Sequence, residues 1–230
     1  MHKRLHLAII CMLMLLTGCW DSVEIENRAF VTVAAFDRHV GQSGKSELKV
    51  SIYPITSGEY KPEPNSKEQD DEGEEGEEGE ESISTSHLME ALVDTLTEAI
   101  HVLNAQTEKK IFLGQLKAII FSKSLLDDAE LMNALAAELE DRPDIDHRVY
   151  IVCADNAAEM LSIMASTNER NPASYITSVL RDKEKMEGET FRLDLETFTM
   201  QLRKGGATTI PYLFEKNGKP VLSGFYDMDP

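Results

Sequence analysis

The residue with the clearest chemical potential is Cys19, which follows an apolar run near the start of this 230-residue chain. Lys3 and Arg4 precede the run, which covers 7–16 and is too short for a membrane-spanning helix of roughly 20 residues. A basic start, a short apolar middle and a small-residue exit are typical of a secretory signal peptide. We therefore expect residues 1–18 to be a signal peptide.

The exit Leu16-Thr17-Gly18-Cys19 also resembles a bacterial lipobox. In that pattern the cysteine thiol, acting as the nucleophile, is alkylated with diacylglycerol, and the chain is then cut just before the cysteine. We expect lipid attachment at Cys19, cleavage between Gly18 and Cys19, and a chain tethered to the extracytoplasmic face of a membrane, because two acyl chains suffice for stable anchoring. The alternative is an ordinary signal peptide followed by an incidental cysteine.

The rest of the sequence offers little for catalysis. It has no Gly-x-Ser-x-Gly elbow, His-Glu-x-x-His motif or phosphate-binding glycine loop. No metal-ligand spacing relates the scattered histidines at 39, 87, 101 and 147. Carboxylates for acid–base work are available in one turn, but we interpret them as solvated; they are Asp141, Asp144 and Asp146. Cys153 lies in an apolar run and is expected to be a buried, inert thiol. We expect no cofactor, no metal and no enzymatic activity.

The charge of the chain is unevenly distributed. The formal net charge of −18 argues against binding to nucleic acid and against adhesion to anionic lipid through a basic patch. Glu68–Glu81 alone holds ten acidic residues and no basic one. Such a segment repels itself and cannot bury apolar surface, so we expect 57–83 to be a disordered acidic loop.

Alternating and continuous apolar patterns predict the elements that surround these residues. Strands are predicted at 28–37, 47–55, 115–122 and 148–154. Helices are predicted at 84–107, 125–140, 155–164, from 172 onward and at 194–204. Asn217-Gly218 between two apolar stretches predicts a terminal β-hairpin. The sequence therefore predicts an α/β (mixed α+β) fold, a mixed β-sheet with helices packed against it.

Three of the predicted helices have a candidate capping residue at their start. The serines and threonine at 84–86 are candidates for the first helix. Ser124 with Asp127 resembles a capping box for the second, and Asp155 is expected to cap the helix that follows the strand at 148–154.

The segment after the lipobox resembles a known family. "GCWDSVEIENRAFVTVAAFD" is similar to the start of Ger(x)C spore germination lipoproteins, through Gly18, Cys19, Trp20, Asp21, Glu24, Ile25, Asn27 and Asp37. Later matches are "GQLKAIIFSKSL" (114–125), "DRPDIDHRVYIVCADNAAEML" (141–161), "NPASYI" and "TTIPYL". The resemblance spans about 19–226.

This resemblance implies the C subunit of a nutrient germinant receptor in the spore inner membrane. Such a subunit acts with an A-type and a transporter-like B-type membrane subunit, and the complex triggers germination when amino acids or sugars bind. The alternative that we weigh is an extracytoplasmic solute-binding lipoprotein of a transporter.

The resemblance also divides the chain. It implies a tether and hairpin over 19–56, the remainder of an N-terminal domain over 84–214, and the start of a truncated second domain over 215–230. Family members are usually longer, so we expect either a fragment or a shortened member.

Overall fold

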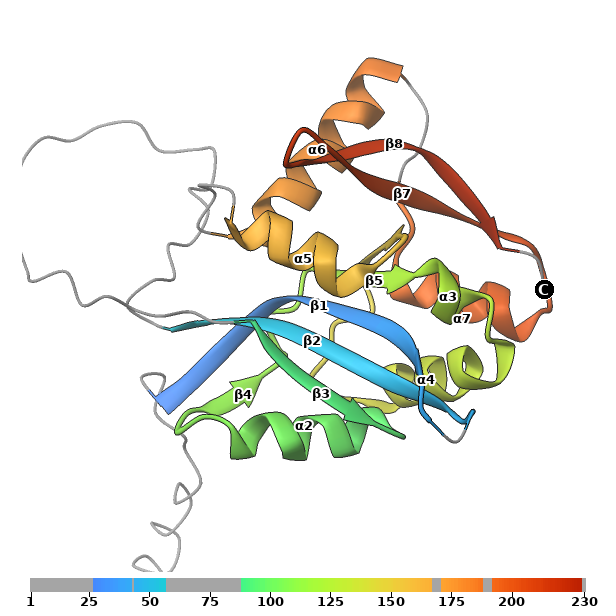
Figure 1. The fold of residues 1–230 in the computed structure, drawn as a ribbon. Helices are drawn as coiled ribbons and strands as arrows, with labels where there is room; N and C mark the ends of the chain where they lie inside the picture. Colours follow the sequence, from blue (N-terminus) through green and yellow to red (C-terminus); the bar gives the residue numbers. More distant parts are fainter. Residues whose placement is uncertain (1–26, 43, 57–87, 167–170, 188–191, 229–230) are drawn as a thin grey trace, which may run out of the picture.

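The computed structural model describes residues 27–42, 44–56, 88–166, 171–187 and 192–228. These residues form one mixed β-sheet with helices on both faces (Figure 1), which confirms the α/β fold and mixed sheet expected from the sequence. The strand order is β3-β2-β1-β5-β6-β7-β8, and β4 lies beside β1 as an eighth strand. The sequence analysis did not predict β4, whose three residues are too few to show a period.

The strands are β1 (Arg28–Val40), β2 (Ser46–Thr56), β3 (Met89–Val93), β4 (Lys110–Phe112), β5 (Ala118–Ser122), β6 (Tyr150–Ala154), β7 (Thr208–Lys216) and β8 (Lys219–Met228). β1 and β2 form the expected antiparallel hairpin, and β7 and β8 form the second one. Asn217 and Gly218 have φ values of 56° and 74°, the left-handed pair that a two-residue type I′ turn requires. Residues 215 and 216 and all of β8 belong to this hairpin. The second domain expected from residue 215 stays a prediction.

The centre of the sheet is parallel. β5 lies between β1 and β6, parallel to both, and β6 pairs in parallel with β7. Every residue of β5 is buried, because helices cover both faces there, and this is why a continuous apolar run predicted the strand. The carboxyl-terminal ends of β5 and β6 meet at one edge of the sheet, which we call the carboxyl edge. The opposite edge, where these strands begin, is the amino edge.

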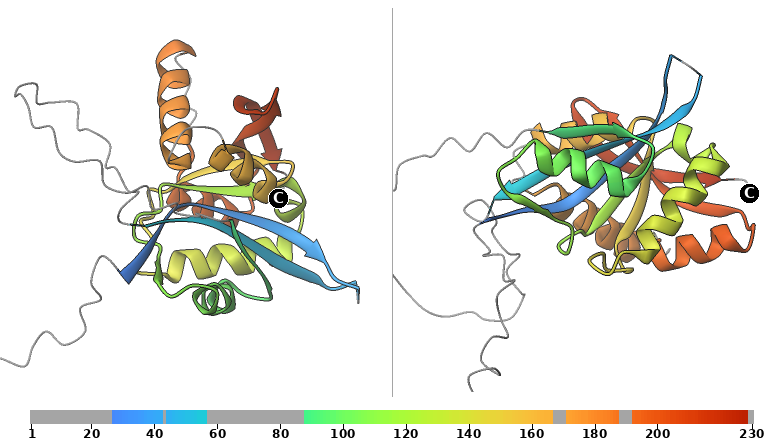
Figure 2. Two further views of the ribbon diagram at one scale, coloured as in Figure 1. Left: turned by 60° about the vertical axis from the view of Figure 1, so that its left-hand side comes forward. Right: turned by 90° about the horizontal axis from the view of Figure 1, so that it is seen from below.

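The helices of the described residues are α2 (Leu96–Ala105), α3 (Lys123–Leu126), α4 (Ala129–Asp141), α5 (Ala157–Ser166), α6 (Pro172–Glu187) and α7 (Leu195–Arg203). Helices α2, α4 and α7 pack on one face of the sheet, and α5 and α6 pack on the other. Figure 2 shows α6 and the β7–β8 hairpin projecting from the face that carries α5. Within the described ranges, no helix combines the length and apolarity that a membrane span requires.

The helix predicted over 84–107 is wrong in its first half. Met89–Val93 form strand β3, which pairs antiparallel with β2, and α2 begins only at Leu96 with Thr95 as its N-cap. Ala91 and Val93 face the core, whereas Leu92, an apolar residue inside the predicted helix, is 49% exposed. The open edge of β2 offers backbone hydrogen bonds to this segment, and that tertiary partner overrides the local pattern. The proposed caps at 84–86 lie outside the described residues.

The second predicted helix is divided in two. Ser122 caps the short α3, and Asp128 caps α4 by accepting a hydrogen bond from the Leu131 amide at 3.1 Å, so the capping box at Ser124 and Asp127 is wrong. Helix α4 ends at Asp141, before Pro143 as expected, since the residue before proline avoids the helical conformation. Helices α5, α6 and α7 confirm the remaining helices.

Cys153 provides a direct test of how closed the core is. Its side chain is fully buried in β6, and burial raises the pKa of the thiol to about 12. Since the thiolate is the reactive form, we expect alkylation of the native chain by iodoacetamide at pH 8 to be slower than for a free thiol by about a thousandfold or more. Mass spectrometry of the Cys153 peptide measures the rate. Unfolding in urea should restore it, and equal rates in both states would contradict the structure.

Candidate functional site

The site predicted from the sequence, Cys19 with the Gly18–Cys19 cleavage point, lies outside the described residues. So do His87 and the acidic segment at 57–83. The other histidines that the sequence singled out do not come together: His39 is on β1, His101 is on α2, and His147 lies between α4 and β6. The described part of the chain holds no group of three or more side chains arranged to bind a metal ion.

Of the three aspartates before β6, Asp141 and Asp146 are exposed, as the sequence suggested, and Asp144 is half-buried. Arg142 donates two hydrogen bonds to Asp144, at 2.9 and 2.7 Å. Arg148 donates to both carboxylate oxygens of Asp146 in the same bidentate arrangement. The hydrogen bonds from Arg148 lower the pKa of Asp146 to about 2. Asp144 and Asp146 are therefore engaged in local ion pairs that shape the turn, and the lowered pKa of Asp146 makes it a poor proton acceptor.

A polar cluster occupies the carboxyl edge of the sheet. Lys123 follows β5 directly, Asp155 follows β6 directly, and Tyr212 comes from β7. Lys123 Nζ lies 2.8 Å from Asp155 Oδ1, and the Tyr212 hydroxyl donates to Asp155 Oδ2 at 2.7 Å. β5 and β6 run in parallel and end at the same edge, which places Lys123 beside Asp155. Tyr212 of β7 pairs with Cys153, two residues before Asp155, and so lies beside them.

The electrostatics of this cluster lock its members in their ordinary charge states. The hydrogen bond to Asp155 raises the pKa of Lys123, and the Lys123 ammonium together with the Tyr212 hydroxyl lowers the pKa of Asp155. Burial raises the pKa of Tyr212. Lys123 Nζ also lies 4.0 Å from the centre of the Tyr212 ring, a cation–π contact. A lysine held as an ammonium fits structural or recognition work better than base catalysis.

Tyr226 of β8 extends the cluster to α3. Its hydroxyl donates to Asp127, and its ring centre lies 5.6 Å from Lys123 Nζ. Burial and the Asp127 carboxylate raise the pKa of Tyr226 to about 12. The β7–β8 hairpin is thus fixed to the sheet edge through two tyrosines and one shared lysine.

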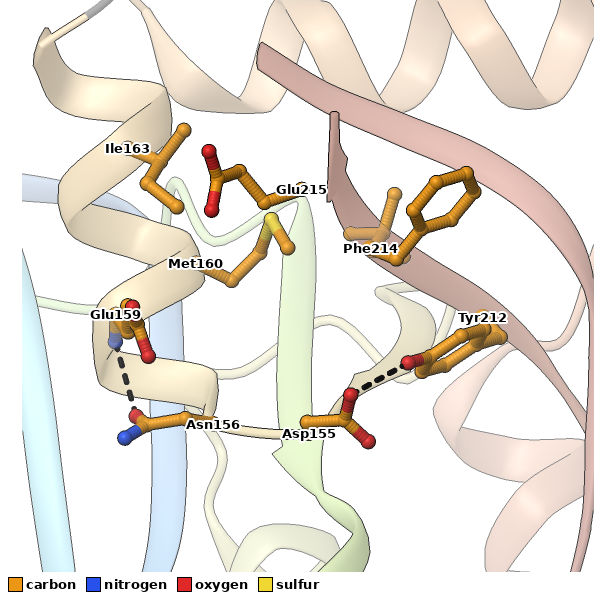
Figure 3. A pocket seen from close by; sticks show the side chains of 9 residues that line it. Asp155, Asn156, Glu159, Met160, Ile163, Tyr212, Phe214 and Glu215 are labelled. Carbon is orange, nitrogen blue, oxygen red and sulfur yellow. Dashed lines mark hydrogen bonds between the residues drawn. The ribbon is translucent and has the colours of Figure 1, made fainter. Parts of the chain in front are cut away.

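A cavity of about 520 Å³ opens beside this cluster, between α5 and β7. Figure 3 shows carboxylates of Asp155, Glu159 and Glu215 around it, with Met160, Ile163 and Phe214 supplying apolar walls. Because carboxylates and apolar side chains share its lining, an elongated group with a positive end, such as a basic side chain of another protein, would fit its chemistry.

Asp37 has a structural role that the sequence analysis missed. Both of its carboxylate oxygens accept backbone hydrogen bonds from the start of α5, at 2.8 Å from Ala157 and 2.9 Å from Ala158. Burial raises the pKa of Asp37, and the two amides offset part of that rise. Asp155, the expected cap, instead points to Lys123 and Tyr212, so that prediction is wrong. Asn156 accepts from the Glu159 amide and completes the real cap.

The signals that could have revealed the cluster are positional. Lys123 and Asp155 each stand next to the end of a buried strand, and the sequence analysis had already identified both strands. What the pattern lacked was the strand order, which decides that the two ends are neighbours.

Comparison with known proteins identifies the family. The family described as "Spore germination protein N-terminal domain" matches residues 21–214. Spore germination protein A3 of Bacillus subtilis (strain 168) is 22% identical over 220 residues, which cover 94% of this chain and 53% of the relative. The chain therefore spans about half the length of that curated relative. No solved structure matches the chain. Together with the described fold, the match over 21–214 shows that this chain belongs to the Ger(x)C family of spore germination proteins.

Proposed function

We propose that this protein is a lipid-anchored, non-catalytic subunit of a spore nutrient germinant receptor, needed for receptor assembly or signalling. Its partners are an A-type and a B-type membrane subunit, and its place is the extracytoplasmic face of the spore inner membrane. The observation that carries the proposal is the family match, which begins at Asp21, two residues after the lipobox cysteine. The paired charges at the carboxyl edge agree with a role in contacts between proteins.

The anchor and the folded domain are close in the chain. Strand β1 begins at Arg28, so residues 20–27 alone separate it from Cys19. A linker of this length reaches at most roughly 30 Å when fully extended. A lipid on Cys19 would therefore hold the amino end of β1 near the membrane surface, where membrane-embedded subunits can contact the domain.

Replacing Cys19 with alanine tests the anchor. Without a thiol there is no nucleophile for lipid transfer, so we expect the chain to leave the membrane fraction or to keep its signal peptide. Cell fractionation and intact-protein mass spectrometry measure both. Cys11→Ala is the matched control, because it removes a thiol from the same apolar region and should leave anchoring intact. Unchanged processing and membrane retention of Cys19→Ala would contradict lipidation.

The receptor role is tested in spores. Deleting the gene should abolish or slow the response to at least one nutrient, and the wild-type gene should restore it. Loss of the A-type subunit from the inner membrane of the deletion strain, measured by immunoblot, would support a role in assembly. Germination at wild-type rate with every nutrient tested would defeat the proposal for this copy.

A further inference from the structure

A second pocket lies at the amino edge of the sheet, away from the α5–β7 cavity. It has a volume of about 230 Å³ and is bordered by the starts of β5 and β6 and by α6. Among the described residues that line it, three are cationic and none is acidic: Lys117, Arg181 and Arg192 are joined by polar and small side chains. This lining has the opposite sign of charge to the chain as a whole, which has 41 acidic and 23 basic residues.

The three cations come from separate segments. Lys117 precedes β5, Arg181 lies on α6, and Arg192 precedes α7. The backbone of Lys117 is fixed, because its amide donates to Thr32 at 2.8 Å and its carbonyl accepts from Tyr150 at 2.9 Å. The Arg192 guanidinium lies 6.0 Å from the Tyr150 ring centre. The fold thus brings three positive side chains together on one concave surface.

Within the described residues, two of these cations have no ion-pair partner. No ion pair joins Lys117 or Arg181 to another residue in the described part of the chain. Lys117 contributes to lowering the pKa of Asp146, and Arg148 already pairs with that carboxylate at 2.9 Å. A concave surface lined with one sign of charge concentrates the opposite ion.

The start of α6 does not itself provide the binding groups. Asn171 Oδ1 accepts from the Ala173 amide at 3.0 Å and from the Thr32 hydroxyl at 3.1 Å, so this helix end is already capped. The donors free to meet a ligand are side chains. Ser174 and Gln115 line the pocket, and within the described residues neither side chain has a hydrogen-bond partner.

We propose that the amino-edge pocket binds a small oxyanion, a phosphate or carboxylate group, between Lys117, Arg181 and Arg192. Guanidinium groups match the spacing of two oxygens on such a group, and a lysine ammonium adds a point charge. The Ser174 hydroxyl and the Gln115 amide complete the donor set. This inference goes beyond the proposed receptor role and does not depend on it.

The test uses the whole chain, purified in non-ionic detergent. Thermal unfolding is measured against inorganic phosphate, with sodium chloride holding the ionic strength constant. We expect the melting temperature to rise with phosphate, because a ligand that binds the folded state stabilises it. A melting temperature that does not depend on phosphate would overturn the proposal.

Charge-matched variants locate the site. Lys117→Gln combined with Arg181→Gln should weaken phosphate binding by about tenfold or more, since charge-assisted hydrogen bonds are the strong ones. Lys216→Gln combined with Lys219→Gln changes the net charge equally, on the exposed turn of the β7–β8 hairpin, and should leave binding unchanged. Arg181→Gln alone, at an exposed position of α6, provides a second variant that should fold normally. Equal phosphate binding by the two double variants would overturn the proposal.

The same measurement distinguishes the sources of the anion. Glycerol phosphate represents a phospholipid headgroup, inorganic phosphate a free ion, and succinate a carboxylate ligand. The ligand that binds most tightly identifies the chemical class of the anion. For each ligand, the Lys117 and Arg181 variants should bind more weakly than the wild-type chain. Binding that these variants retain would place the ion elsewhere and contradict the assignment.

Discussion

Replacing Phe121 with alanine should lower the free energy of unfolding by about 4 kcal/mol, which is typical of buried phenylalanines replaced by alanine in other proteins. Phe121 is fully buried in the central strand β5. Its ring centre lies 5.9 Å from that of Phe36 on β1 and 5.4 Å from that of Phe198 on α7. Its removal therefore leaves a cavity where two central strands meet a covering helix.

Urea unfolding followed by circular dichroism measures this loss. Since whole domains are stable by roughly 5–15 kcal/mol, Phe121→Ala removes a large share of the stability, and a milder variant keeps the test readable if the domain unfolds. Phe121→Leu keeps most of the volume and should cost less, about 1–2 kcal/mol. The control is Phe225→Ala, at a ring that is 39% exposed, with an expected loss below about 1 kcal/mol. A stability of Phe121→Ala within 1 kcal/mol of wild type would contradict this packing.

The parts of the fold that the sequence predicted well are those whose signal is local. Continuous apolar runs identified β5 and β6 because a strand covered on both faces has no polar side to show. Asn217-Gly218 identified the terminal turn because few other residues accept a left-handed backbone.

The parts that the sequence missed depend on partners far along the chain. Leu88 and Leu92 are four residues apart, which suits a helix, but an alternating strand also places them on one face. The neighbouring strand β2 decided between these structures. The cluster of Lys123, Asp155 and Tyr212 joins three segments, and no local spacing encodes their meeting.

Asp37 illustrates the same limit and carries the second large prediction. Asp155 stands next to α5 in sequence and was the expected cap, yet Asp37, 120 residues away from Ala157, accepts the hydrogen bonds. Asp37 is 8% exposed and lies at the end of the core part of β1. It therefore joins the sheet to the first turn of α5, where the helix dipole also favours a negative charge.

Asp37→Ala should lower the free energy of unfolding by about 3 kcal/mol, because it leaves two buried amides, of Ala157 and Ala158, without acceptors. Asp37→Asn should recover only part of this loss, since an amide side chain offers one oxygen and turns an N–H group toward the second donor. Urea unfolding and hydrogen exchange at the Ala157 and Ala158 amides measure both effects.

The matched control for Asp37 is Asp155→Ala. It removes the carboxylate that the sequence alone would select, but that side chain is 74% exposed and its partner Lys123 can turn to water. We expect a loss below about 1 kcal/mol, as for other exposed ion pairs. The two variants change the net charge equally, so their difference isolates the buried cap. If Asp155→Ala destabilised the chain as much as Asp37→Ala, or left the α5 amides equally unprotected, the sheet-to-helix hydrogen bonds would not be what holds α5 on the sheet.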